Sequence, residues 1–91
     1  MKIHKVRLFE DASDLILDVP KHTNFLTVQR QNGNIVIWYS FEKESEQIVL
    51  RRLVKVGAGQ EVNGEHLAYI ATVQEDMLVW HFFEDLAYVP N

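Results

Sequence analysis

Residues 25–41, FLTVQRQNGNIVIWYSF, decide the fold of this chain. Two runs rich in β-branched and aromatic side chains flank the pair Asn32-Gly33. Asn and Gly both tolerate a positive φ, as the two central positions of a type I′ turn require, and the twist of that turn matches the twist of the strands it joins. The stretch therefore predicts a β-hairpin with strands at residues 25–31 and 35–41.

The rest of the chain shows further short apolar runs bounded by turn residues, which predict strands. We expect an acidic turn at residues 10–14 and a strand that stops at Pro20, and the Glu, Lys and Leu content of residues 42–53 leaves a helix there as the less favoured alternative. The additional strands are expected at residues 2–9, 15–19, 47–56, 67–73 and 77–83. The sequence therefore predicts one all-β domain over residues 1–91, a small β-sandwich or partly open barrel of about six to seven mostly antiparallel strands.

Alternation along the strands indicates which side chains share a face, since successive side chains point to opposite sides. Residues 77–83 are apolar on both faces, which predicts a central strand. Arg52 is the exception to a simple pattern, because alternation places it with Leu50 and Val54 on an apolar face. A β-bulge at Arg51-Arg52 would explain this by resetting the side that faces inward.

Composition indicates an ordinary globular protein. The chain has 91 residues, of which 47% are hydrophobic and 24% charged, and it contains no cysteine. Disulfides and thiolate metal sites are therefore excluded, as in proteins of a reducing cytosol. No apolar run approaches the roughly 20 residues that span a bilayer, so we expect a soluble, cytoplasmic protein with no membrane partner.

The net charge of −4 is unevenly distributed. All nine basic residues lie between Lys2 and Lys55, whereas residues 56–91 carry six acids and no Lys or Arg. Nucleic-acid binding depends on clustered basic side chains, and the only dense group is Arg51, Arg52 and Lys55, which we interpret as a solvated strand face. We therefore expect no nucleic-acid partner, while the acidic end would suit a basic protein partner.

The sequence contains no recognised catalytic or metal-binding pattern. The four histidines, His4, His22, His66 and His81, are scattered, and none stands at a metal-ligand spacing from another. His81 interrupts an apolar strand, where we interpret it as a structural histidine that needs a hydrogen-bond partner. We expect no enzyme activity, no cofactor and no metal.

Several motifs together carry a resemblance over nearly the whole chain. They are Pro20, Val28-Gln29-Arg30-Gln31, Trp38, Val56-Gly57-Ala58-Gly59, Tyr69-Ile70-Ala71-Thr72 and Leu78-Val79-Trp80-His81-Phe82-Phe83-Glu84. The chain resembles a family of short, uncharacterised bacterial and bacteriophage proteins, in which Gly is commoner at position 71 and Thr-Gly-His at positions 58–60. The resemblance implies a bacterial or phage origin and supports the fold, and it implies no activity.

Taken together, these observations predict a small non-enzymatic accessory protein that binds another protein, with a second copy of itself as one candidate. Too many strands are apolar on both sides for one small interior to cover. The candidate interface is the strand face formed by Ile35, Ile37, Tyr39 and Phe41.

Two alternatives remain open. One is a minor structural component of a virion. The other is a ligand-binding module with a pocket centred on His81, or on His66, near Glu84 or Glu65.

Overall fold

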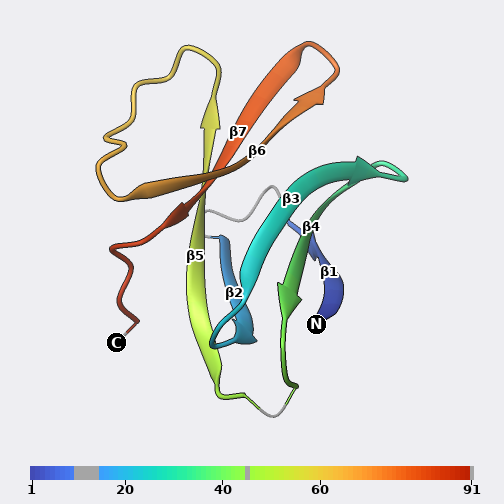
Figure 1. Cartoon of the computed structure of the whole chain (residues 1–91). Helices are drawn as coiled ribbons and strands as arrows, with labels where there is room; N and C mark the ends of the chain where they lie inside the picture. The colour runs from blue at the N-terminus through green and yellow to red at the C-terminus, as the bar shows by residue number, and fades with distance from the viewer. Residues whose placement is uncertain (10–14, 45, 91) are drawn as a thin grey trace.

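The computed structural model describes residues 1–9, 15–44 and 46–90, which form seven strands and no helix. The acidic turn expected at residues 10–14 lies outside the described residues. The strands are β1 (Lys2–Leu8), β2 (Leu15–Pro20), β3 (Asn24–Gln31), β4 (Asn34–Phe41), β5 (Ile48–Gly57), β6 (Leu67–Glu75) and β7 (Leu78–Asp85) (Figure 1). The predicted all-β fold is confirmed, and residues 48–53 belong to a strand rather than to a helix.

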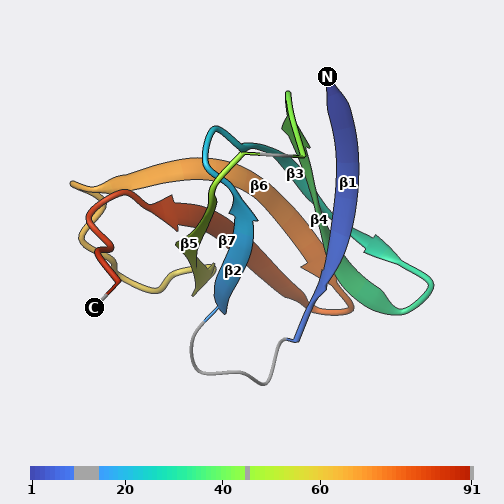
Figure 2. The ribbon, with the colours of Figure 1, turned by 90° about the horizontal axis from the view of Figure 1, so that it is seen from below.

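The strands form two antiparallel sheets, one of three strands in the order β1-β4-β3 and one of four in the order β2-β5-β7-β6. β7 lies between β5 and β6, as predicted from its two apolar faces. On one side of the molecule β3 lies beside β6. On the other side β1 and β2 are edge strands, and no pairing joins them in the described part of the chain, so the two sheets do not close into a barrel (Figure 2).

The hairpin of β3 and β4 has the turn that its sequence predicts. Gln31 pairs with Asn34, which leaves Asn32 and Gly33 as the two loop residues. Their φ angles are 50° and 81°, both positive, as a type I′ turn requires. The turn therefore sets the register that places Ile35 and Ile37 on the inward side of β4.

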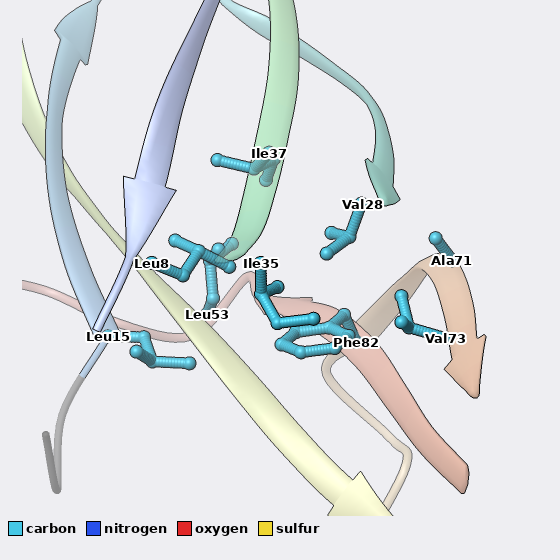
Figure 3. Packing of buried hydrophobic residues seen from close by; sticks show 9 residues of the cluster. All are labelled: Leu8, Leu15, Val28, Ile35, Ile37, Leu53, Ala71, Val73 and Phe82. Carbon is cyan, nitrogen blue, oxygen red and sulfur yellow. The ribbon is translucent and has the colours of Figure 1, made fainter. Parts of the chain in front are cut away.

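One hydrophobic core fills the space between the sheets. Phe82 and Leu53 of the four-stranded sheet and Ile37 of the three-stranded sheet belong to the same cluster, and all three side chains are almost completely buried. Burying a side chain of this size contributes about 1.5–3 kcal/mol relative to exposure. The full cluster, shown in Figure 3, is Leu8, Leu15, Val28, Ile35, Ile37, Leu53, Ala71, Val73 and Phe82.

The bulge predicted at Arg51-Arg52 is wrong. β5 keeps an unbroken register with both neighbours here, with Arg52 opposite Ile16 of β2 and Leu53 opposite Glu84 of β7. The register shifts lie elsewhere, between residues 25 and 27 of β3 and between residues 69 and 71 of β6. Alternation along β5 is therefore regular, and the apolar face that carries Arg52 is the outer one.

The neighbouring Arg51 points inward and links the two sheets. Its Nε and Nη2 donate hydrogen bonds to Oε2 and Oε1 of Glu84, at 2.5 and 2.6 Å, and its Nη1 donates to the carbonyl oxygen of Thr23 at 2.5 Å. The guanidinium carbon lies 4.5 Å from the ring centroid of Phe25. A charge on the inner side of β5 is thus satisfied by an ion pair, a carbonyl and an aromatic ring, without a break in the strand.

Candidate protein-binding surface

The docking face expected on β4 lies inside the molecule. Ile35, Ile37 and Phe41 expose only 2%, 0% and 3% of their surface. Tyr39 is half-buried, and its ring centroid lies 6.0 Å from that of Phe41 and 6.1 Å from that of His4. β4 is the central strand of its sheet, so the inward side of this strand faces the other layer. Three of the four residues of the expected interface are therefore buried in the folded chain, and only Tyr39 remains partly accessible.

An apolar surface instead lies on the outward side of the four-stranded sheet. Leu53 and Phe82 point into the core, so alternation turns their neighbours outward. Cross-strand pairing then aligns the outward residues of all four strands in rows. The outer face, as we call it below, is formed by Ile16, Ile48, Leu50, Arg52, Val54, Tyr69, Phe83 and Asp85.

Large apolar side chains on this outer face are open to solvent. Ile16, Ile48 and Leu50 are exposed on β2 and β5, and Tyr69 exposes 61% of its surface on β6. Val54, Phe83 and Tyr69 stand in one row across three strands, and the rings of Phe83 and Tyr69 meet edge to face with centroids 5.7 Å apart. Contiguous exposed apolar residues of this kind mark interaction surfaces more often than isolated ones do.

The ionic groups near the middle of the outer face are paired within the chain. Nη1 of Arg52 donates a hydrogen bond to Oδ2 of Asp85 at 2.9 Å. The two residues are direct cross-strand partners by the register of β5 and β7, because Leu53 pairs with Glu84. The pair places opposite charges side by side, so the middle of the outer face carries little net charge.

A chain of hydrogen bonds borders the outer face at β6 and β7. The hydroxyl groups of Tyr69 and Thr72 are 2.6 Å apart, and Oγ1 of Thr72 lies 2.9 Å from Nδ1 of His81. The register shift between residues 69 and 71 puts Tyr69 and Thr72 on the same side of β6. His81 thus has the hydrogen-bond partner that its position in an apolar strand requires.

A pocket of about 310 Å³ lies beside the Arg52–Asp85 pair of the outer face, where the segment before β6 and the segment after β7 border the sheet. It is lined by Arg52, Val54, Val62, Asn63, His66, Leu67, Asp85 and Ala87. His66 contributes to it, but His81 does not. His81 and Glu84 lie on opposite faces of β7, and Glu84 binds Arg51 on the inner side, so the pocket expected around His81 and Glu84 does not form.

The described residues show neither a metal cluster nor a membrane helix. Within residues 1–9, 15–44 and 46–90, no three His, Asp or Glu side chains stand close enough to hold a metal ion. The same residues contain no helix with the length and apolar character needed to cross a bilayer.

The outer face was visible in the sequence but was misinterpreted. The alternation of Ile48, Leu50, Arg52 and Val54 is the correct signal for these residues. Because an apolar strand face ordinarily packs inward, we expected a bulge to remove Arg52 from it. The structure shows that the whole alternating set, arginine included, faces outward.

Comparison with known proteins gives a family and no further relative. The chain matches the family described as a domain of unknown function (DUF7352) over residues 1–89, and it belongs to that family. No curated protein and no solved structure matches the chain.

Proposed function

We propose that this chain is a non-enzymatic protein-binding domain that associates with a second copy of itself through the outer face. The observation that carries the proposal is the set of exposed apolar side chains on the outward side of the four-stranded sheet, with Ile16 and Leu50 on β2 and β5 and Tyr69 on β6. Sheets whose outward face is apolar commonly bury that face against a second sheet, about 10 Å away.

The charge pattern of the outer face is compatible with a second copy as the partner. The chain has a net charge of −4, so two copies carry like net charges. On the outer face, however, Arg52 is neutralised by Asp85 of the same chain. Asp18, opposite Leu50, is a further exposed carboxylate on this face, so the face can meet its own copy in an arrangement that keeps the two Asp18 residues apart.

Dimerisation through the outer face requires that several large side chains become buried rather than one. Each exposed Leu, Ile or Tyr that becomes buried contributes about 1–2 kcal/mol, at roughly 25 cal/mol per Å². Association of two proteins costs about 4–15 kcal/mol in lost freedom of motion. Ile16, Ile48, Leu50 and Tyr69 lie on one face, so their contributions act together against that cost.

The positions of the histidines support a role without catalysis. His4 packs on aromatic rings, His22 lies 3.5 Å from Glu46, and His81 is held by Thr72. His66 lines the pocket beside an arginine and an aspartate that already bind each other. Among the described residues only His81 contacts a hydroxyl group that could act as a nucleophile, that of Thr72, and no carboxylate orients its ring as a catalytic pair would require.

We also infer a bacterial or phage origin and a cytoplasmic site of action. The resemblance of the motif at residues 78–84 to short bacterial and phage proteins supports the origin. The lack of cysteine is in keeping with a reducing compartment. In the bacterial cytoplasm the domain acts as an accessory protein that associates with a second copy of itself.

The proposal is tested by the solution mass of the Leu50→Glu variant. We expect the wild-type chain to elute as a dimer in size-exclusion chromatography with light scattering, and Leu50→Glu to elute as a monomer with an unchanged circular-dichroism spectrum. The matched control is Leu26→Glu, because Leu26 lies on β3 and is similarly exposed, at 46% against 40% for Leu50. A monomeric wild-type chain, or loss of the dimer in both variants, would overturn the proposal.

A further inference from the structure

β1 has a free edge, with which no other strand of the described chain pairs. It pairs on one side with β4 along its whole length, from Lys2 opposite Phe41 to Leu8 opposite Ile35. The next strand along the chain, β2, belongs to the other sheet. The backbone groups on the free side of β1 are therefore available to hydrogen-bond another strand, and the sheet can be extended there.

The side chains of β1 make this edge basic. The strand carries Lys2, His4, Lys5 and Arg7 and no acidic residue, in a chain whose net charge is −4. Lys2 is paired with Glu44 at 3.1 Å. Lys5 and Arg7 are held by neutral groups in the described part of the chain: Lys5 by the amide oxygen of Gln31, and Arg7 by the ring of Phe9. No acidic side chain neutralises either charge, but the Lys5 ammonium is directed across Trp38 of β4 toward β3, so its side chain has to turn to the free side of β1 to meet an anionic partner.

The two faces of β1 differ in chemistry. Lys5 and Arg7 share the outward side, opposite Trp38 and Val36 of β4. Val6 and Leu8 share the inward side, opposite Ile37 and Ile35. A strand added next to β1 would continue the same alternation, because its side chains also point alternately to the two faces.

We propose that the free edge of β1 accepts an extended segment of another protein as an added strand, and that the accepted segment alternates acidic with apolar side chains. Its acidic residues lie beside Lys5 and Arg7, and its apolar residues lie beside Val6 and the core. This is a second surface, distinct from the outer face, and it does not depend on self-association there.

The same charges disfavour a second copy of β1 as the occupant. Antiparallel pairing of two β1 strands would, in two of the registers that keep the outward residues together, place Lys5 next to Lys5 or Arg7 of the other copy, and like charges directly opposite each other destabilise a sheet. Basic edge strands are a common protection against unwanted pairing. Here the protection is selective, because it rejects a basic strand and admits an acidic one.

The test uses a capped peptide of about seven residues, the length of a typical strand, that alternates Glu and Val. In amide NMR spectra of the labelled chain, we expect this peptide to shift the resonances of β1, and its Kd to rise with salt. A peptide with the same composition, but with its Glu and Val residues in two blocks, is the first control. The second carries N-methyl groups on alternate amides, which keeps every charge and removes the backbone hydrogen bonds.

Both control peptides should bind at least about tenfold more weakly, a difference of about 1.4 kcal/mol. The Lys5→Glu/Arg7→Glu variant should also bind the alternating peptide at least about tenfold more weakly. The Lys43→Glu variant, a charge reversal in the exposed loop after β4, should bind it with unchanged affinity. Equal binding of all the peptides, shifts that spare β1, or tighter binding of a thymidine oligonucleotide at the same residues would overturn the proposal. Because Leu50→Glu leaves β1 intact, repeating the titration on that variant separates this result from the fate of the dimer.

Discussion

The outward sides of the two sheets carry similar apolar residues, but only one of them is sealed by its own chain. On the three-stranded sheet, Val36 is opposite Arg7 on one flank and Gln29 on the other, and the Nζ of Lys5 lies 5.3 Å from the ring centroid of Trp38. Val36 is thereby 7% exposed although no second layer covers it. Long polar side chains on the flanking strands can cover an apolar central strand while their charges remain in water.

The four-stranded sheet has no such cover over the part of its outer face that carries Ile16, Ile48 and Leu50. Leu50 is opposite the short side chain of Asp18, and Ile16 is opposite Arg52, whose guanidinium is directed to Asp85. The apolar residues therefore stay exposed. In this chain, therefore, the length of the polar side chains on the flanking strands, rather than the hydrophobicity of the central strand, determines which sheet face stays exposed to a partner.

The largest difference in stability between the two faces is expected from a matched pair of charge substitutions. Val36→Asp places a carboxylate at a buried position on the sealed face and should reduce the free energy of unfolding by about 3 kcal/mol or more. Leu50→Asp places the same group on the open face and should change the unfolding of the monomer by about 0.5 kcal/mol or less. Urea denaturation of both variants at low protein concentration measures this. Similar losses of unfolding free energy in the two variants would show that the two faces do not differ in burial.

Glu84 and Asp85 are neighbours on β7 and point to opposite faces of the sheet, so they allow a second comparison of its inner and outer sides. Glu84→Gln weakens the paired hydrogen bonds to the largely buried Arg51 and should cost about 2–3 kcal/mol. Asp85→Asn affects the more exposed Arg52 and should cost about 0.5 kcal/mol. Thermal unfolding of the two variants shows which of the two substitutions destabilises the fold more. If Asp85→Asn were the more damaging, the outer pair would be a main support of the fold.

Sequence reasoning predicted the elements better than it predicted the faces. The Asn32-Gly33 turn and the seven strands follow from local chemistry, which is written along the chain. β4 is apolar on both sides, with Ile35 and Ile37 on one and Val36 and Trp38 on the other, so alternation alone cannot say which side faces inward. That choice depends on the position of the other sheet, which is a long-range property.

The same limit explains the error at Arg52. Its exposed apolar neighbours on β5 could be identified from the sequence, but their exposure follows from β2 and β7 lying beside β5 and from no second sheet lying against the outer side in the described part of the chain. The rows of residues across β5, β7 and β6 likewise require the register, which the sequence does not specify.

Removing the cover from the sealed face should have a moderate effect. Lys5→Ala removes the alkyl chain and the ammonium group beside Trp38, and should lower the free energy of unfolding by about 0.5–1 kcal/mol. The emission of Trp38, measured in a Trp80→Phe background, should shift to longer wavelength as its ring gains contact with water. An unchanged spectrum would mean that Lys5 does not shield the ring.

The smallest effect is expected from making the open face wholly apolar. The double variant Arg52→Met/Asp85→Leu replaces the ion pair by apolar groups, and should change monomer stability by no more than about 1 kcal/mol. The dimer should become tighter, because no charges then have to be desolvated on association. Sedimentation equilibrium measures this change, and a weaker dimer would indicate that the ion pair itself takes part in the contact.

The most direct test of the central claim is an isotope-filtered NMR experiment on a mixture of labelled and unlabelled chains. The account predicts intermolecular nuclear Overhauser effects between copies at the methyl groups of Ile16, Leu50 and Val54, and none at Leu26. Intermolecular effects confined to other residues, or their complete absence at concentrations well above the expected Kd, would contradict it.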